Sequence, residues 1–192
     1  MARPMGPRFK LSRHLGANVF GHPKALNRGI KNHRHSEYGE QLLEKQKLKA
    51  YYGILEKQFR GYVKEALKTK SNPGQVLTQQ LETRLDNMVY RLGFANSLRQ
   101  ARQMVVHGHI LVNNIKVDRP SYAVQEGDVL SLKESSKKVD LFTENFKNNE
   151  SLLPYIEKYS EDYSGRLIRM PLRDEIPIDV KDAKILEYYS KL

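Results

Sequence analysis

The fold is decided by one stretch, TRLDNMVYRLGFANSLRQARQMVVHGHILVNN, which covers residues 83–114. Its apolar residues first recur at steps of three and four, as they do on one face of a helix, and Gly93 interrupts this pattern. After Gly108 the apolar residues follow the spacing of a strand. The sequence therefore predicts two short helices followed by a small sheet.

Each of these two helices is expected to begin at a capping box, because Thr83 is followed by Asp86 and Ser97 by Gln100 at the required spacing. The polar residues of each helix fall away from its apolar set, so we expect them to face outward. These residues are Arg84, Asn87 and Arg91 on the first helix and Arg99, Arg102 and Gln103 on the second.

The sheet is expected to open with a tight hairpin. Asn113 and Asn114 separate Ile110–Val112 from Ile115–Val117, and asparagine tolerates the positive φ of a primed turn. A third strand is expected at Val129–Leu132. The remaining expectations are a polar connection over 136–149, a short helix over 152–159, an edge strand over 166–169 and an apolar group over 180–189 that docks on the body.

A helical pattern also precedes this stretch. From Ser36 onward, apolar residues from Leu48 to Ala66 recur at helical steps, and lysines and arginines fall on another strip of the same cylinder. Gly53 lies inside this pattern and predicts a break, since glycine costs about 1 kcal/mol against alanine within a helix. Residues 71–74, Ser-Asn-Pro-Gly, are expected to end this helical stretch.

The N-terminal arm, up to His35, carries eight of the eleven net positive charges and has no Asp or Glu up to residue 36. Its prolines and glycines predict an extended segment. A transit peptide and a disordered tail are the alternatives; the early prolines oppose the amphipathic helix of a transit peptide, and anchors such as Phe9, Leu15 and Val19 oppose a disordered tail.

Composition narrows the possible partners. Lys and Arg number 33 against 22 Asp and Glu, so the formal net charge is +11, and nucleic acid is the first candidate partner, with a membrane surface as its rival. No apolar run approaches the roughly 18 residues of a spanning helix, and no signal-peptide core is present, so we expect a cytoplasmic protein without a membrane partner. The absence of Cys excludes disulfides and thiolate zinc sites.

RNA fits this charge pattern better than DNA does. Cations on rigid helix faces bind the phosphates of irregular RNA. The guanidinium group of arginine can donate to two phosphate oxygens at once. The sequence shows no helix of the kind that reads bases in the major groove of DNA. A solvated basic surface is the alternative for any single cation. The candidate RNA contacts are Arg3, Arg8, Lys10, Arg13, Arg28, Lys47, Lys49, Lys57, Arg60, Lys64, Arg84, Asn87, Arg91, Arg99, Arg102, Gln103 and His107.

Residues 84–94, 97–103 and 110–113 closely resemble the bacterial family of ribosomal protein number four of the small subunit. Matches outside this region include Met1-Ala2-Arg3, Tyr38-Gly39, 44–47 and 186–191, so the resemblance extends over nearly the whole chain. It implies a structural, non-enzymatic protein that binds a multi-helix junction in the 5′ domain of 16S rRNA early and nucleates assembly of the small subunit.

The resemblance also implies a second location. Family members lie near the mRNA entrance beside the proteins numbered three and five, where they influence decoding fidelity and help to unwind mRNA. At the matching positions, Lys31 and Arg34 would face that entrance. The protein would be a monomer within the ribosome.

The chain departs from many relatives, which carry zinc-binding cysteines in the arm and a Gly-Gln-His-Gly loop before Tyr38-Gly39. His14, His22, His33 and His35 match no familiar zinc spacing, so we expect neither a metal nor another cofactor. The conformation of the arm is therefore the least determined part of the chain.

Two other function classes share the two-helix module. Pseudouridine synthases carry a catalytic Arg-Leu-Asp that Arg84-Leu85-Asp86 resembles. A carboxylate near a helix N-terminus is stabilising, so Asp86 has a sufficient structural role there. The remaining sequence has no phosphate loop or nucleophile elbow. Stress-linked RNA-binding factors resemble the chain only across 83–134. We therefore expect no catalytic residues.

The expected architecture is α+β in three parts. They are a basic extended arm at 1–35, a helical subdomain at 36–82 completed by 170–192, and a mixed subdomain at 83–169 that contains the RNA-binding module at about 83–145.

Overall fold

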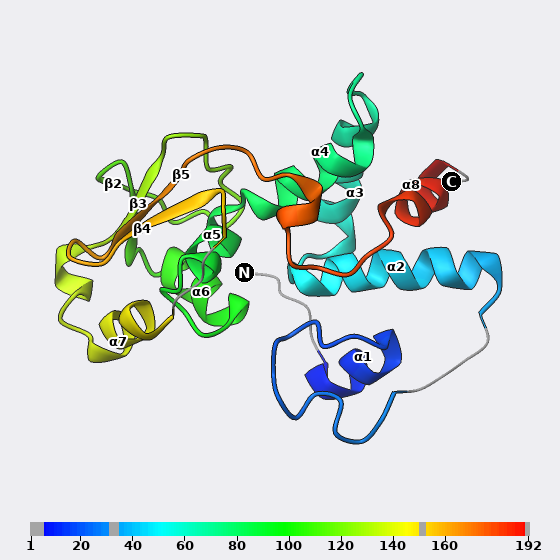
Figure 1. The fold of residues 1–192 in the computed structure, drawn as a ribbon, viewed down its shortest axis with the longest axis horizontal. Coiled ribbons are helices and arrows are strands. Elements are labelled where there is room, and N and C mark those ends of the chain that lie inside the picture. Colours follow the sequence, from blue (N-terminus) through cyan, green and yellow to red (C-terminus); the bar gives the residue numbers. More distant parts are fainter. Residues whose placement is uncertain (1–5, 31–34, 150–152, 191–192) are drawn as a thin grey trace. The chain divides into compact units, whose positions relative to one another are not determined.

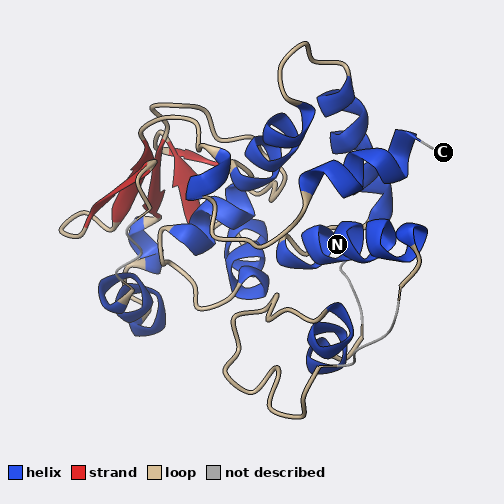
Figure 2. Ribbon diagram, turned by 45° about the vertical axis from the view of Figure 1, so that its right-hand side comes forward, coloured by secondary structure: helices blue, strands red, loops and turns tan. Residues whose placement is uncertain are grey.

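The computed structural model describes residues 6–30, 35–149 and 153–190. The chain divides into two compact units. The helical unit consists of Met1–Thr78 and Pro177–Leu192, and the mixed unit consists of Gln79–Ile176. Figure 1 traces the elements along the chain, and Figure 2 shows the strands gathered in one sheet, in which every pair is antiparallel. The predicted α+β class is confirmed.

The helical unit is built mainly from three helices with a shared apolar core. These helices are α2 (Glu37–Tyr51), α3 (Glu56–Leu67) and α8 (Asp182–Ser190). Leu48, Phe59 and Ile185, one from each helix, are fully buried, and the ring centre of Phe59 lies 6.1 Å from that of Tyr189 in α8.

The predicted docking of the last apolar group is confirmed for Val180 and Ile185, which are buried, whereas Ala183 is exposed. Tyr188 of α8 is also buried, and the Nζ of Lys45 in α2 lies 4.4 Å from the centre of its ring.

The predicted break in the helical pattern is also confirmed. Gly53 has φ +57 and separates α2 from α3, a conformation that L side chains rarely adopt. The prediction that this helical stretch ends before residues 71–74 is confirmed, because α3 ends at Leu67, but a further helix, α4 (Pro73–Glu82), begins at Pro73. The Oδ1 of Asn72 accepts a hydrogen bond from the Gly74 amide at 3.0 Å, so asparagine and proline start a helix at this point.

The arm is not wholly extended, so that expectation is wrong over α1 (Arg8–Leu15). Pro7 occupies the N-cap position and Gly16, with φ +67, the C-cap position. Proline and glycine therefore lie at the two ends of this helix and do not interrupt it. Leu15 and Val19 are buried, so these apolar anchors of the arm pack inside the helical unit.

The mixed unit contains α5 (Leu85–Arg91) and α6 (Leu98–Val106), which pack on the sheet. The strands are β1 (Ile110–Val112), β2 (Ile115–Lys116), β3 (Val129–Leu132), β4 (Ile156–Tyr159) and β5 (Ser164–Leu167), in the order β2-β1-β3-β5-β4 with every pair antiparallel. The predicted helix pair and hairpin are confirmed. Asn113 and Asn114 form the turn at φ +49 and +65.

Four local predictions in the mixed unit are wrong. The segment 136–149 is no polar connection, since the 3₁₀ turn η1 (Glu134–Ser136) leads into α7 (Asp140–Asn148). Within the expected helix at 152–159, residues 156–159 form strand β4, and the expected edge strand at 166–169 overlaps the interior strand β5. The expected capping box at Thr83 does not form: Arg84 is the N-cap residue, and the Thr83 hydroxyl donates to the carbonyl of Gln79.

A second 3₁₀ turn, η2 (Arg173–Glu175), lies near the end of the mixed unit. Among the described helices, none combines the length and the apolar character needed to cross a bilayer.

Candidate nucleic-acid interface

Helix α6 presents the clearest polar face of the mixed unit. The Oγ of Ser97 accepts a hydrogen bond from the Gln100 amide at 3.3 Å, so the predicted serine cap is present. The Gln100 side chain instead accepts from the amide of Asn96, one residue before the expected position. Ala101 and Val105 are buried against the sheet. The exposed side is formed by Arg99, Gln103 and His107, which follow one another at intervals of four residues.

Helix α5 does not present the outward polar face that its sequence suggests. Arg84 is 2% exposed and Asn87 is 3% exposed, so their expected exposure is wrong. The Nδ2 of Asn87 donates to the carbonyl of Glu82 at 2.8 Å. The loop from Arg119 to Tyr122 covers this end of the helix, because the amides of Leu85 and Asp86 donate to loop carbonyls.

Asp86 is fully buried and binds two arginines. Its Oδ1 and Oδ2 accept hydrogen bonds from the Nε and Nη2 of Arg84 at 3.0 and 2.9 Å. Its Oδ2 also accepts from the Nε and Nη2 of Arg102 at 2.9 and 2.6 Å. Two guanidinium groups on one carboxylate leave a net positive charge. The Arg102 side chain is 14% exposed, so the carboxylate fixes a cation at the surface of α6.

Arg91, the third candidate on α5, is likewise engaged inside the protein. Its Nε lies 2.5 Å from the Oε1 of the buried Glu82, and the same oxygen accepts from the Tyr155 hydroxyl at 2.7 Å. Burial, and then the neighbouring Glu82 carboxylate, raise the pKa of Tyr155. This network joins α4, α5 and the segment before β4, which gives Arg91 a structural role.

Basic residues that the sequence interpretation did not select extend the polar face beyond the end of α6. Gly108, at φ +72, leaves room for the side chain of Lys116, since a Cβ at this glycine would lie 2.4 Å from the Lys116 Cε. His109 is half-buried, and its Nδ1 lies 2.9 Å from the Ser136 Oγ. Burial, and then His107 and Lys133, lower the pKa of His109. The hairpin prediction could have indicated Lys116, because the hairpin returns the chain toward the end of α6.

In the helical unit, the candidate cations divide into exposed and paired groups. Lys57, Arg60 and Lys64 are exposed along one side of α3. Lys47 and Lys49, by contrast, pair with carboxylates: their Nζ atoms lie 2.8 Å from Glu44 and 2.6 Å from Glu56.

In the arm, Arg8, Lys10 and Arg28 are exposed and Arg13 is half-buried. Arg3, and the candidate entrance residues Lys31 and Arg34, lie outside the described residues. Within the described ranges, no group of three or more His, Asp or Glu side chains could hold a metal ion. His33, one of the four histidines of the arm, lies outside the described residues.

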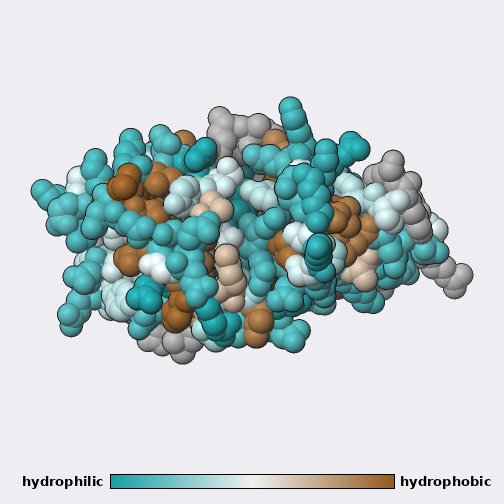
Figure 3. Space-filling model, turned by 90° about the horizontal axis from the view of Figure 1, so that it is seen from above, coloured by the Kyte–Doolittle hydropathy of each residue, from teal (hydrophilic) through white to brown (hydrophobic). Residues whose placement is uncertain are grey.

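On the face shown in Figure 3, hydrophilic side chains cover most of the surface and apolar ones form scattered patches. Exposed lysine and arginine on stable helices, with one guanidinium fixed by a buried carboxylate, suit the phosphates of a folded nucleic acid.

Comparison with known proteins agrees with this geometry. Residues 3–82 match the model of the ribosomal protein S4/S9 N-terminal domain, and residues 83–130 match the S4 domain. The chain is 63% identical over 191 residues to small ribosomal subunit protein uS4B of Clostridium acetobutylicum, with all of both chains covered. The chain belongs to the family of small ribosomal subunit protein uS4.

Two further uS4 proteins match over the full length of both chains. Identity is 54% over 199 residues to that of Finegoldia magna and 44% over 211 residues to that of Aquifex aeolicus. Within this family, the exposed face of α6 and the Asp86 network lie in the S4 domain, and α1 to α3 lie in the N-terminal domain. The resemblance found in the sequence is thus confirmed.

Proposed function

We propose that this chain is a structural, non-enzymatic protein of the small ribosomal subunit that binds 16S rRNA. The observation that carries the proposal is the match of the whole chain to uS4 proteins, of which the first is 63% identical. A stress-linked factor or a synthase fragment would share the S4 domain alone, whereas residues 3–82 also match a ribosomal protein domain. As a part of the ribosome, the protein would be cytoplasmic.

The rRNA surface that we propose contains the exposed members of the candidate set. In the mixed unit these are Arg99, Gln103 and His107, with Arg102 fixed beside them by Asp86. In the helical unit they are Lys57, Arg60 and Lys64 of α3 and the cations of the arm. Arg84, Asn87 and Arg91 would act by supporting this surface, because each is bonded within the mixed unit.

The finer role follows the family resemblance. We propose early binding to a junction in the 5′ domain of 16S rRNA, followed by nucleation of subunit assembly. A second role, at the mRNA entrance beside the proteins numbered three and five, would use Lys31 and Arg34 and affect decoding accuracy.

Two measurements test the proposal. In sedimentation of a cell extract, the protein should appear in the small-subunit peak even after a high-salt wash, and a free or large-subunit location would refute the ribosomal assignment. In filter binding with a 16S 5′ domain fragment, replacing both Arg99 and Arg102 with Ala should weaken binding by about 1–3 kcal/mol and make the salt dependence shallower, while circular dichroism shows that folding is kept. An unchanged salt dependence would exclude these two arginines as phosphate contacts.

The entrance role has its own test. Changing Lys31 and Arg34 together should alter decoding accuracy or the translation of structured mRNA more than it alters affinity for 16S rRNA. The reverse order of effects would exclude the proposed entrance residues.

A further inference from the structure

The arm of the helical unit contains a hollow of about 350 Å³ lined by Phe9, Arg13, Lys24, Ala25, Asn27 and Arg28. Phe9 and Arg13 come from α1, and the other four residues come from the loop that follows it. The volume lies at the lower end of the range of about 300–1,000 Å³ that is typical of small-molecule sites. The hollow is therefore large enough for one nucleotide.

Local hydrogen bonds fix the conformation of the loop. The Nδ2 of Asn18 donates to the carbonyl of His22 at 3.1 Å, and the amide of His22 donates back to the Asn18 Oδ1 at 3.2 Å. The amide of Ala25 donates to the His22 carbonyl, and Ala25 is 1% exposed. Its methyl group is thus a fixed part of the wall.

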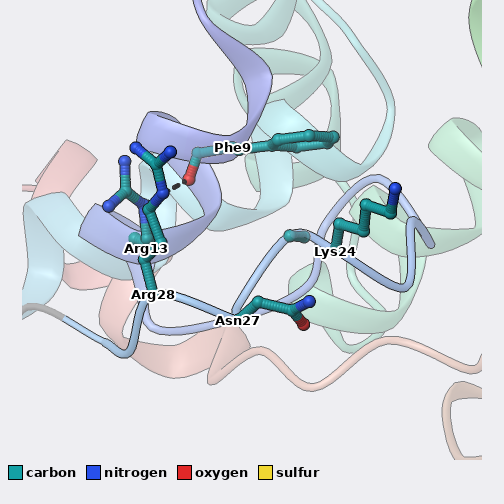
Figure 4. A pocket seen from close by; sticks show the side chains of 6 residues that line it. Phe9, Arg13, Lys24, Asn27 and Arg28 are labelled. Atoms are coloured by element: carbon teal, nitrogen blue, oxygen red, sulfur yellow. Dashed lines mark hydrogen bonds between the residues drawn. The ribbon is translucent and has the colours of Figure 1, made fainter.

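The charge of the hollow points to an anion. Figure 4 shows the guanidinium groups of Arg13 and Arg28 together on one side of the hollow and Lys24 toward the other. Residues 1–36 contain no Asp or Glu, and in the described part of the chain neither arginine has an ion-pair partner. The Nε of Arg13 donates to the carbonyl of Phe9 at 3.2 Å, which orients the guanidinium and leaves its terminal nitrogens for a ligand.

The rest of the lining suits a flat ring. The Phe9 side chain is half-buried, and its ring centre lies 4.7 Å from that of His22, which supports the ring. Unpaired bases of RNA stack on aromatic side chains, and every base offers a π-face for this contact. The Asn27 amide offers both a donor and an acceptor to a base edge. Inorganic phosphate would contact the arginines but would make no use of the Phe9 ring or the Asn27 amide.

We propose that the hollow binds one unstacked nucleotide of RNA, with its phosphate between Arg13 and Arg28, its base against Phe9 and its base edge at Asn27. The proposal rests on the proposed function, because it takes the nucleotide to belong to the bound rRNA. It adds a base contact to a segment in which only phosphate contacts were expected.

The test uses the full-length protein and a transcript of the 16S 5′ domain. Phe9→Ala should weaken binding roughly 5- to 150-fold, the contribution of one base–aromatic stack. The salt slope should stay unchanged, because no charge is removed. Phe9→Tyr keeps the flat ring and should bind nearly as well as the wild type. Leu11→Ala is the matched control, since it truncates a partly exposed apolar residue of the same helix outside the hollow.

Chemical probing of the base edges locates the nucleotide. One base should be protected by the wild type and regain reactivity with Phe9→Ala and with Asn27→Ala. Asn27 is exposed, so its variant stays informative even if Phe9→Ala unfolds the arm. Arg28→Ala should reduce the salt slope by about one unit.

The outcomes separate this proposal from the proposed function. If the wild type itself shows no salt-dependent binding to the transcript, the proposed function fails as well. If the wild type binds but Phe9→Ala behaves like Leu11→Ala and no base changes reactivity, the nucleotide site is refuted while rRNA binding stands. If Arg28→Ala weakens binding and neither Phe9→Ala nor Asn27→Ala does, the hollow binds an anion without a base, and the proposal is again refuted.

Discussion

At the scale of single residues, Asp86 has the most specific role in the mixed unit. Replacing it with Asn would leave the guanidinium groups of Arg84 and Arg102 without their buried countercharge. Breaking a buried ion pair in this way costs about 3–5 kcal/mol. We therefore expect Asp86→Asn to lower the free energy of unfolding by about that amount, measured by urea denaturation followed by circular dichroism.

Asp118 provides the control for this prediction, because it is an exposed carboxylate of the same unit. Asp118→Asn removes the same charge and should change the free energy of unfolding by less than about 0.5 kcal/mol. Equal effects of the two variants would mean that net charge, and not the arginine pairing, determines the loss of stability.

Glu56 should make the stability of the helical unit depend on acid. Burial alone would raise the pKa of its carboxyl, but hydrogen bonds from Lys49, Tyr189 and Lys45 outweigh burial and lower the pKa to about 2. The unfolded value is about 4.3, so this contribution is complete above that pH and is lost as the pH falls toward 2. The side chain is 46% exposed, so the effect should be modest.

The measurement is the thermal midpoint of the wild type and of Glu56→Gln as a function of pH. The wild type should be the more stable of the two at pH 6, and the difference should shrink between about pH 4.5 and 2. A difference that stays constant across this range would contradict the assignment.

The sequence could predict the side-chain types of the candidate site better than their burial. The exposed face of α6 is predictable from the helical period alone. This period places Arg99, Gln103 and His107 on the side opposite the buried residues. The burial of Arg84 and Asn87 was missed because it is caused by the loop at 119–122, far along the sequence, whose carbonyls bind the amides at the start of α5. Helical periodicity does not show that a loop distant in the sequence packs over the start of a helix.

At the scale of elements, the packing of α5 on the sheet depends on a glycine in β5. A Cβ at Gly165 would lie 2.4 Å from the Cδ2 of Leu92 and 2.9 Å from the carbonyl oxygen of Glu157. Overpacking of this kind costs about 1–3 kcal/mol. Gly165→Ala should therefore destabilise the mixed unit by that amount in chemical denaturation.

A second glycine should show the opposite sign. Gly61 lies on the exposed side of α3, and a Cβ there would meet nothing within 4 Å. Gly61→Ala should stabilise the protein by about 0.5–1 kcal/mol, because alanine is the better helix former. If both variants shifted stability in the same direction, the packing explanation for Gly165 would fail.

The elements that the sequence predicted correctly are those determined by neighbouring residues. The hairpin depends on Asn113 and Asn114 at its turn, and α6 depends on its serine cap. Strand β4 was predicted as a helix because its short apolar pattern fits both periods. Strand β5 was predicted at the edge because the order of strands in a sheet is set by distant pairing, here with β3 and β4.

At the scale of the whole molecule, the distribution of charge is the property that the sequence predicts most directly. The acid-free arm supplies eight of the eleven net charges, whereas residues 135–192 hold ten cations against eleven acids. If phosphate neutralisation drives binding, cations of the arm should contribute to the salt dependence, as those of the proposed α3 and α6 surface do, and cations of the balanced C-terminal part should not.

Replacing Arg8 and Lys10 with Gln should reduce the slope of log K against log salt by roughly 1.4 to 1.8, since each released counterion contributes about 0.7 to 0.9. Both side chains are exposed, so the fold should persist. Replacing Lys147 and Lys181 with Gln removes the same charge from exposed positions of the balanced part and should leave the slope unchanged. Filter binding to the 5′ domain transcript at several salt concentrations measures both. Equal slope changes would mean that rRNA responds to the net charge of +11 as a whole, and the separate role of the arm would then be wrong.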